Sequence, residues 1–182
     1  LGIYALEIPT DPQSGVDVGK LSQALDSYPV KACILQPNFN NPFGCLTPDD
    51  KKRELAELFA ARNVPLIEDD IVGDLPFSGL RPRAINAFVD SENSVYISSF
   101  SKMLAPGFRI GWLWARNHRP ALLRRKMAVS MNSNRPAQLT LAEYLAAGRY
   151  GKHLKSYSLK CKKQVGLVSA AVARFFPAST RL

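Results

Sequence analysis

The chain has 182 residues, of which 46% are hydrophobic and 21% charged. This composition is typical of a folded globular protein and argues against a disordered, collagen-like or membrane-spanning chain. The 24 Lys and Arg against 15 Asp and Glu give a net charge of +9, which divides into −4 over residues 1–115 and +13 over residues 116–182. A basic stretch can follow phosphate groups, but such residues more often form a solvated helix face.

The three cysteines are too few and too scattered for a disulfide framework or a zinc site. They favour a reducing compartment, and we expect a cytoplasmic protein with neither a metal nor a membrane partner. The first residues contain no initiator Met and no apolar segment of signal-peptide length. We therefore expect a piece of a longer protein.

Short apolar runs alternate with longer amphipathic ones, without internal repeats or a Gly/Ser-rich linker. The runs predict strands at 3–8, 32–36, 64–68, 94–98 and 109–114. Near-continuous apolar content in the first three is typical of strands that are covered on both faces. The alternation predicts an α/β fold with a doubly wound, mostly parallel sheet and flanking helices.

Helical spacing of apolar residues predicts a helix over 48–62, where Leu55, Leu58 and Phe59 share one face. Thr47 is the expected N-cap, followed by Pro48 at the first helical position. The basic third of the chain predicts three further helices, at 119–131, 136–147 and 150–175.

Ligands of open α/β sheets bind at the carboxyl ends of the strands, so the segments that follow the strands are the place to search. Three of them carry polar groups: PNFNNPFG, DDIVGDL and SFSKMLAPGFR. Each also has a structural explanation. Asn41, Pro42 and Gly44 suit a turn, and Asp69 and Asp70 can cap the next segment.

The third segment has similar alternatives. Ser99 and Ser101 can form caps or a turn in which a hydroxyl bonds the backbone, Lys102 can be a solvated turn residue, and Arg109 can pair with any surface carboxylate.

Taken together, these side chains supply complementary parts of one site. Lys102 offers an amine for a Schiff base, and the neighbouring hydroxyls with Arg109 form an anion clamp. Asp69 suits a pyridinium nitrogen, since it would keep such a ring protonated as an electron sink. The amide of Asn41 can donate to a phenolate oxygen.

The motifs NNPFG at 40–44, EDD at 68–70 and SSFSKMLAPGFRIGW at 98–112 resemble the fold-type-I, class I/II aminotransferases. The resemblance covers nearly the whole chain and implies the large domain of the aspartate-aminotransferase-like fold with pyridoxal 5'-phosphate as cofactor. It further implies that Lys102 binds the cofactor covalently and that Asp69 pairs with the pyridine nitrogen. Asn41 would bond the phenolic oxygen. The implied phosphate ligands are Ser99, Ser101 and Arg109.

One position departs from the family pattern. A tyrosine two or three places after the pyridine-pairing aspartate usually donates to the same phenolic oxygen, but Ile71 and Val72 occupy those places here. Losing this donor is expected to change the proton affinity of the cofactor's Schiff base. Efficient transamination is therefore less expected than cofactor binding.

The flanking segments IEDDIVGDL, RPRAINAF and LAEYLAAGRYGKHLKSYSLKCKKQVGLVSAAVARFFP resemble the MocR type of GntR regulators. That resemblance implies a cofactor-dependent effector domain that senses an amino compound and binds DNA through a winged helix-turn-helix outside this chain, as a homodimer. It divides the chain into 1–148, the central part of the large domain, and 149–182, an interdomain helix leading to a small domain outside it.

Two alternatives stay open. One is an aminotransferase that moves an amino group between an amino acid and a 2-oxo acid, with the freed Lys102 amine as general acid and base. The other, less favoured, is direct nucleic-acid binding by the basic residues themselves. Those residues are Arg124, Arg125, Lys126, Lys152, Lys155, Lys160, Lys162 and Lys163.

Overall fold

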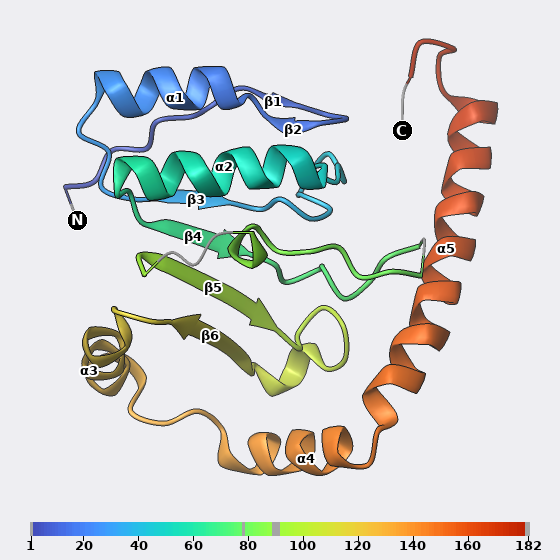
Figure 1. Ribbon diagram of the computed structural model, residues 1–182. Coiled ribbons are helices and arrows are strands. Elements are labelled where there is room, and N and C mark those ends of the chain that lie inside the picture. Colours follow the sequence, from blue (N-terminus) through green and yellow to red (C-terminus); the bar gives the residue numbers. More distant parts are fainter. Residues whose placement is uncertain (1, 78, 89–91, 181–182) are drawn as a thin grey trace.

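A four-stranded sheet forms the centre of the molecule, which is a computed structural model that describes residues 2–77, 79–88 and 92–180. Its strands are β3 (Cys33–Leu35), β4 (Leu66–Asp69), β5 (Ser94–Ser99) and β6 (Gly111–Ala115), in that order across the sheet (Figure 1). The first three are parallel and β6 runs antiparallel to β5. The predicted mostly parallel α/β sheet is therefore confirmed.

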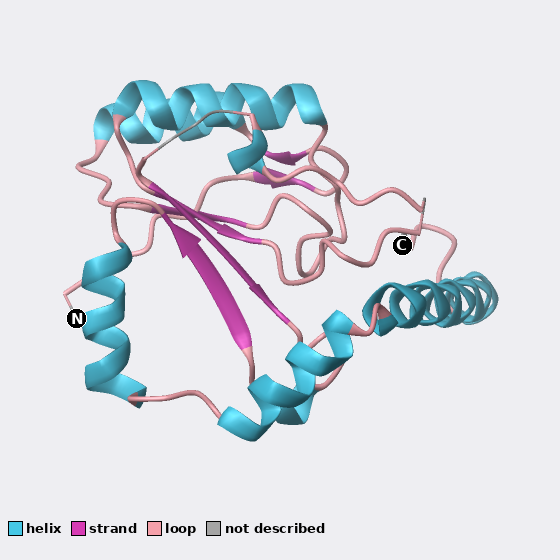
Figure 2. Ribbon diagram, turned by 60° about the horizontal axis from the view of Figure 1, so that its bottom comes forward, coloured by secondary structure: helices cyan, strands magenta, loops and turns pink. Residues whose placement is uncertain are grey.

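Helices α1 (Val18–Ser27) and α2 (Asp49–Arg62) lie side by side against one face of this sheet (Figures 1 and 2). A short hairpin, β1 (Thr10–Asp11) and β2 (Gly15–Val16), precedes α1. The main hydrophobic core fills the space between these helices and the strands. It consists of Val16, Leu21, Leu55, Ala56, Phe59, Leu66 and Ile85.

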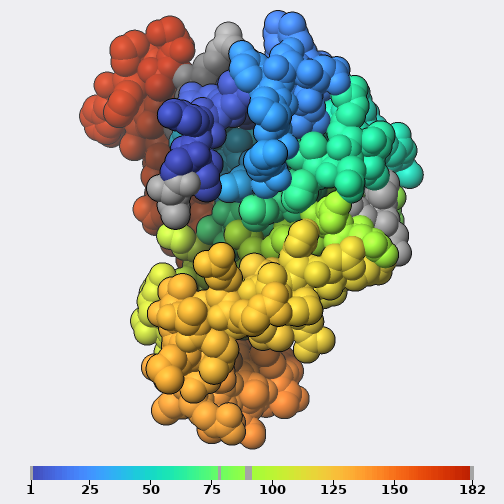
Figure 3. All heavy atoms as spheres, turned by 90° about the vertical axis from the view of Figure 1, so that its left-hand side faces the viewer, coloured from blue at the N-terminus to red at the C-terminus, as the bar shows by residue number. Residues whose placement is uncertain are grey.

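The remaining helices follow β6 around the edge of the sheet. They are α3 (Arg119–Ser130), α4 (Arg135–Ala146) and α5 (Arg149–Phe175), and α5 passes the end of the sheet where β4 and β5 finish (Figure 1). In Figure 3 the surface of α3 and α4, coloured yellow to orange, projects below the body formed by α1 and α2. Two short 3-10 helices complete the secondary structure, at Ile85–Ala87 and Pro106–Phe108.

None of the described helices combines the length and the apolar character needed to cross a lipid bilayer.

The predicted strand at 3–8 is wrong. Those residues form no strand, and Ile3 and Tyr4 are 80% and 96% exposed. An extended apolar segment becomes a strand only where a neighbour accepts its backbone hydrogen bonds and covers its side chains. No strand of the described residues pairs with this segment.

The predicted N-cap of α2 is also wrong, because Pro48 occupies that position and no side chain caps the helix. Thr47 is buried, and its N–H donates to Pro37 O at 2.8 Å. The preceding loop therefore holds Thr47 away from the helix terminus. Two acidic residues in the first turn, Asp49 and Asp50, still favour this end of the helix dipole.

Candidate functional site

The three polar segments meet at one edge of the sheet, because each follows a parallel strand. Leu35 lies opposite Glu68, and Asp69 lies opposite Ile97, two residues before the end of β5. The backbone N–H of Asp70 continues this ladder by donating to Ile97 O at 3.0 Å. The segments after β3, β4 and β5 thus leave the sheet at neighbouring positions.

Lys102 lies in the tight turn that follows β5. Leu104 N donates to Phe100 O at 2.8 Å, which closes this turn, while Met103 is buried with 3% of its surface exposed. The side chain of Lys102 is exposed, and among the described residues its amine has no hydrogen-bond or ion-pair partner. An exposed, unpaired amine is free to bind a ligand.

The two serines and Arg109 surround the same turn. Ser99 Oγ accepts from Ser101 N at 3.0 Å, so the hydroxyl–backbone turn expected as one alternative is present. Arg109 Nη1 donates to Ser101 Oγ at 3.4 Å, and this guanidinium bonds no carboxylate among the described residues. Ser101 and Arg109 therefore lie within reach of each other as one cationic, hydroxyl-bearing group.

The return from this turn into β6 is sterically tight. Arg109 has a left-handed backbone with φ 53°, which is uncommon for a residue with a side chain. At Gly111 an added Cβ would come within 2.9 Å of Ser98 O, so only glycine fits beside β5. Strained and close-packed backbone of this kind occurs preferentially at functional sites.

The three acidic residues at the end of β4 alternate between the two faces of the sheet. Glu68 and Asp70 are buried, whereas Asp69 between them is half-buried. Asp69 Oδ1 accepts only a 3.2 Å bond from Ile71 N among the described groups. Asp69 is therefore the carboxylate that remains available to a ligand.

Asp70 belongs to a buried polar layer beneath the site. It accepts from Asn38 Nδ2 at 2.8 Å, from Arg81 Nη2 at 2.6 Å and from the Tyr96 hydroxyl at 2.5 Å. Burial, together with the Asp70 carboxylate, raises the pKa of Tyr96 above its ordinary range. Asp70 therefore stabilises the loops and does not cap the following segment through its side chain.

Glu68 holds the RPRAINAF segment against the sheet. Its carboxylate accepts from Ile85 N at 2.6 Å and from the backbone and side-chain nitrogens of Asn86, at 3.1 and 2.7 Å. Burial raises the pKa of Glu68, and these three hydrogen bonds oppose the shift. The buried amine of Lys52 bonds Arg83 O of the same segment at 2.8 Å.

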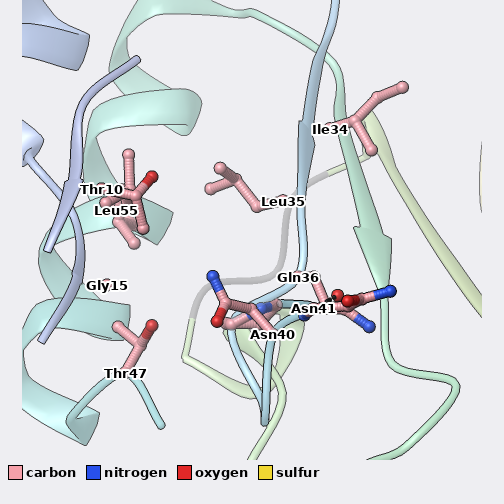
Figure 4. A pocket seen from close by; sticks show the side chains of 11 residues that line it. Thr10, Gly15, Ile34, Leu35, Gln36, Asn40, Asn41, Thr47 and Leu55 are labelled. Atoms are coloured by element: carbon pink, nitrogen blue, oxygen red, sulfur yellow. Dashed lines mark hydrogen bonds between the residues drawn. The ribbon is translucent and has the colours of Figure 1, made fainter. Parts of the chain in front are cut away.

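Asn41 lies in a turn after β3, as its structural alternative predicted. Its backbone N–H donates to Gln36 Oε1 at 2.8 Å, Gly44 N donates to Asn40 O at 2.6 Å, and the Asn41–Pro42 peptide bond is cis. The turn borders a cavity of about 220 Å³ beside β3. In Figure 4, Leu35 and Asn40 point across this cavity toward Thr10, Leu55 and Thr47, while Ile34 points away.

The six predicted residues therefore form two groups. One group is on β4, β5 and the turn that follows: Asp69, Ser99, Ser101, Lys102 and Arg109. Asn41 lies beside β3 and is the only one of the six that lines the cavity.

The donor set of this edge fits a phosphorylated aldehyde with a protonated ring nitrogen. It combines an unpaired amine, a half-buried carboxylate and a clamp of hydroxyls with a guanidinium. Groups of three or more His, Cys, Asp or Glu arranged to bind a metal are absent from the described part of the chain.

Several residues around the site were not predicted from the sequence. Asn38, Arg81 and Tyr96 join the buried layer, and Tyr150 and His153 of α5 reach the site loops. The alternation of side chains along a strand does assign Glu68 and Asp70 to the face opposite Asp69. Their partners lie 11 to 32 positions away from Asp70, where no local signal identifies them.

Comparison with known proteins gives relatives of two kinds. Over 97% of its length the chain is 33% identical to the uncharacterized HTH-type transcriptional regulator YjiR of Escherichia coli, and over its whole length 36% identical to YdcR of the same organism. It is 30% identical, over 94% of its length, to aromatic-amino-acid aminotransferase 1 of Thermococcus litoralis. The chain spans only about two fifths of the length of these relatives, 38%, 39% and 42% respectively.

Solved structures share the fold. Alpha-aminoadipate aminotransferase LysN of Thermus thermophilus, complexed with N-(5'-phosphopyridoxyl)-L-leucine, superposes with a TM-score of 0.90 over 97% of this chain and 46% of its own, at 24% identity. The kynurenine aminotransferase of Pyrococcus horikoshii superposes with a TM-score of 0.88. The match covers 96% of this chain and 44% of that enzyme, at 28% sequence identity. The family model "Aminotransferase class I and II" matches residues 2–171. The chain therefore belongs to the class I and II aminotransferase family.

Proposed function

We propose that this chain is the central part of a pyridoxal-phosphate-binding effector domain in a transcriptional regulator of the MocR type. The turn that carries Lys102 supports the cofactor, because an exposed, unpaired amine there lies within three residues of Ser99 and Ser101. The similarity to YjiR and YdcR over nearly the whole chain supports the regulator.

The residues of the site would bind different parts of the cofactor. Lys102 would bind its aldehyde carbon covalently through Nζ, with the aldehyde oxygen leaving as water, and Asp69 would hold the protonated ring nitrogen. Asn41 would donate to the phenolic oxygen, while the phosphate would be held by Ser99, Ser101 and Arg109. Pyridoxal phosphate supplies an electron-withdrawing ring that stabilises negative charge on a bound amino compound.

The proposal extends to the rest of the protein. Residues 1–148 would form the central part of the large domain, and residues 149–182 would connect it to a small domain outside this chain. DNA would be bound by an N-terminal domain that also lies outside it. We further propose a cytoplasmic homodimer whose ligand is an amino acid or another amino compound.

The covalent role of Lys102 is tested in the full-length protein with added pyridoxal phosphate. Borohydride reduction should attach the cofactor to the peptide containing Lys102, as measured by mass spectrometry, and Lys102→Ala should abolish that adduct. Lys31→Ala, which removes another exposed lysine, is the control and should retain it. An adduct of unchanged amount in Lys102→Ala would falsify the proposal.

Asp69 and Asp50 make a second, matched test. Asp69→Ala should weaken cofactor affinity roughly tenfold or more, as expected when a charged group loses its hydrogen-bond partner. Asp50→Ala removes an exposed carboxylate in the first turn of α2 and should leave the affinity unchanged. Equal affinities in both variants would remove Asp69 from the site.

An aminotransferase remains the second candidate, supported by the similarity to the Thermococcus litoralis enzyme. Ile71 and Val72 stand where the family usually has a tyrosine, which makes efficient transfer of an amino group less expected. Two observations separate the candidates. A helix-turn-helix encoded upstream of residue 1 favours the regulator, and rapid conversion of the cofactor by amino acids followed by turnover with a 2-oxo acid favours the enzyme.

A further inference from the structure

Helix α5 contacts two of the three segments that build the site, those after β4 and β5, although it buries none of its own residues fully. The Phe100 and Tyr150 rings meet edge to face, with centroids 5.7 Å apart. His153 Nε2 lies 2.7 Å from the carbonyl oxygen of Met103. Phe100 and Met103 precede and follow Lys102 in the sequence, so α5 contacts its turn both before and after this residue.

A second set of contacts runs from α5 to the loop after β4. The Tyr150 hydroxyl donates to Asp74 Oδ2 at 2.9 Å, and Asp74 Oδ1 accepts from Arg81 Nε at 2.6 Å. Arg81 in turn bonds Asp70, the neighbour of Asp69. About two turns further along the helix, Ser158 Oγ donates to Pro76 O at 3.1 Å.

We infer that Tyr150 and His153 are positioning residues that couple the placement of α5 to the turn carrying Lys102. This inference rests on the proposed function, in which Lys102 holds the cofactor. Most of the other α5 residues are exposed, and these side-chain hydrogen bonds attach the helix to the loops after β4 and β5. Coupling of this kind is reciprocal, so occupancy at Lys102 would in turn bias the position of α5.

The chemistry of the two residues differs. His153 would donate its Nε2–H to the Met103 carbonyl, and its ring stacks on Tyr157 with centroids 5.7 Å apart. His153→Phe therefore removes the donor and retains an aromatic ring. Tyr150→Phe keeps the ring against Phe100 and removes only the bond to Asp74.

The test measures amide hydrogen exchange in the full-length, cofactor-free protein. The N–H groups of Leu104 and Ala105 both donate to Phe100 O, so their exchange reports on the Lys102 turn. His153→Phe should speed their exchange roughly 2- to 10-fold, as expected for one lost hydrogen bond. Tyr150→Phe should instead speed exchange in the loop around Asp74 and leave Leu104 and Ala105 near wild type.

Ser158→Ala is the matched control, because it removes an α5 hydrogen bond that reaches only Pro76. It should leave the Lys102 turn unchanged. In the cofactor-loaded protein, His153→Phe should also move the pH midpoint of the cofactor's absorbance band, and Ser158→Ala should not. His153→Gln, which retains an N–H donor, should restore both readouts toward wild type.

The outcomes are separable. If His153→Phe leaves exchange of the turn unchanged, or if Ser158→Ala speeds it equally, α5 does not position Lys102 and the inference is overturned. If the wild-type protein forms no cofactor adduct, the proposed function fails, while the exchange experiment on cofactor-free protein still decides the contacts of α5. Should His153→Phe not fold, Tyr150→Leu decides instead, because it removes the ring that packs against Phe100. It should speed the exchange of Leu104 and Ala105, and unchanged exchange there contradicts the inference.

Discussion

The two halves of the molecule are built differently. From the hairpin to β5, the chain encloses a hydrophobic core between α1, α2 and the sheet, with a hydrogen-bonded polar layer beneath the site. From β6 onward, α3 and α5 have no fully buried residue, and apolar side chains such as Val129 and Leu159 are exposed. The first half encloses the main hydrophobic core, whereas in the second half β6 pairs with β5 and α5 contacts the site loops through a few side chains.

The division of charge follows the same boundary. The net −4 lies in residues 1–115, which contain the packed half, and the net +13 lies in residues 116–182, which contain α3, α4 and α5. The buried core and the candidate site residues are therefore concentrated in the same half. The same type of substitution should therefore change the free energy of unfolding very differently in the two halves.

The largest contrast is expected from apolar truncation. Leu55 in α2 is fully buried, so Leu55→Ala should cost about 2–5 kcal/mol of the free energy of unfolding. Val129 in α3 is 84% exposed, and Val129→Ala should change it by less than about 0.5 kcal/mol. Urea denaturation of the full-length protein measures both, and equal losses would mean that α3 is buried against a part of the protein outside this chain.

Added methyl groups give the second contrast. A Cβ at Gly73 would lie 2.2 Å from Asp70 Oδ1, and Asp70 is fixed by three partners, so Gly73→Ala should cost about 1–3 kcal/mol. At Gly151 in α5 nothing lies within 4 Å, so Gly151→Ala should stabilise the helix by about 1 kcal/mol. The midpoint temperature of thermal unfolding should therefore fall in Gly73→Ala and rise in Gly151→Ala. A higher midpoint in Gly73→Ala would contradict the rigid placement of Asp70.

The smallest expected effect is on the free energy of unfolding at alkaline pH, and it involves one tyrosine from each half, Tyr96 and Tyr150. Burial, reinforced by Asp70 and Asp74 respectively, raises the pKa of Tyr96 and Tyr150 above the ordinary value of 10.0. Above pH 10 the folded state keeps protons that the unfolded state loses, so this stabilisation is complete below pH 10 and declines above it. Tyr150→Phe should make the decline of unfolding free energy with pH shallower, and an unchanged slope would show that Tyr150 does not contribute.

Much of the fold could be predicted because its signals are local. Helix α2 begins and ends within a residue of the predicted 48–62, since apolar spacing and terminal charges lie within the helix itself. Helix α1 was missed, although Asp17 accepts from Lys20 N as an N-cap and Leu21 and Ala24 form its buried face. These signals lie within the helix itself, so α1 could also have been predicted from the sequence.

The sequence predictions are wrong where the local structure depends on residues that are distant in the sequence. The apolar run at 3–8 has the composition of a strand but no neighbour in the described part of the chain. Thr47 has the chemistry of an N-cap, but a bond to Pro37 holds it in the loop. The partners of Asp70 are brought together only by the folded sheet, so its structural role could not be predicted from the segment DDIVGDL.

Both tryptophans of the chain, Trp112 and Trp114, lie on β6, at the boundary between the two halves. Each is about half exposed, at 47% and 46%, and Trp112 stacks near Tyr96 with ring centroids 5.2 Å apart. The tryptophan fluorescence of this chain therefore originates at a single edge of the sheet. A blue shift of its emission would report directly that something has covered β6, without any label.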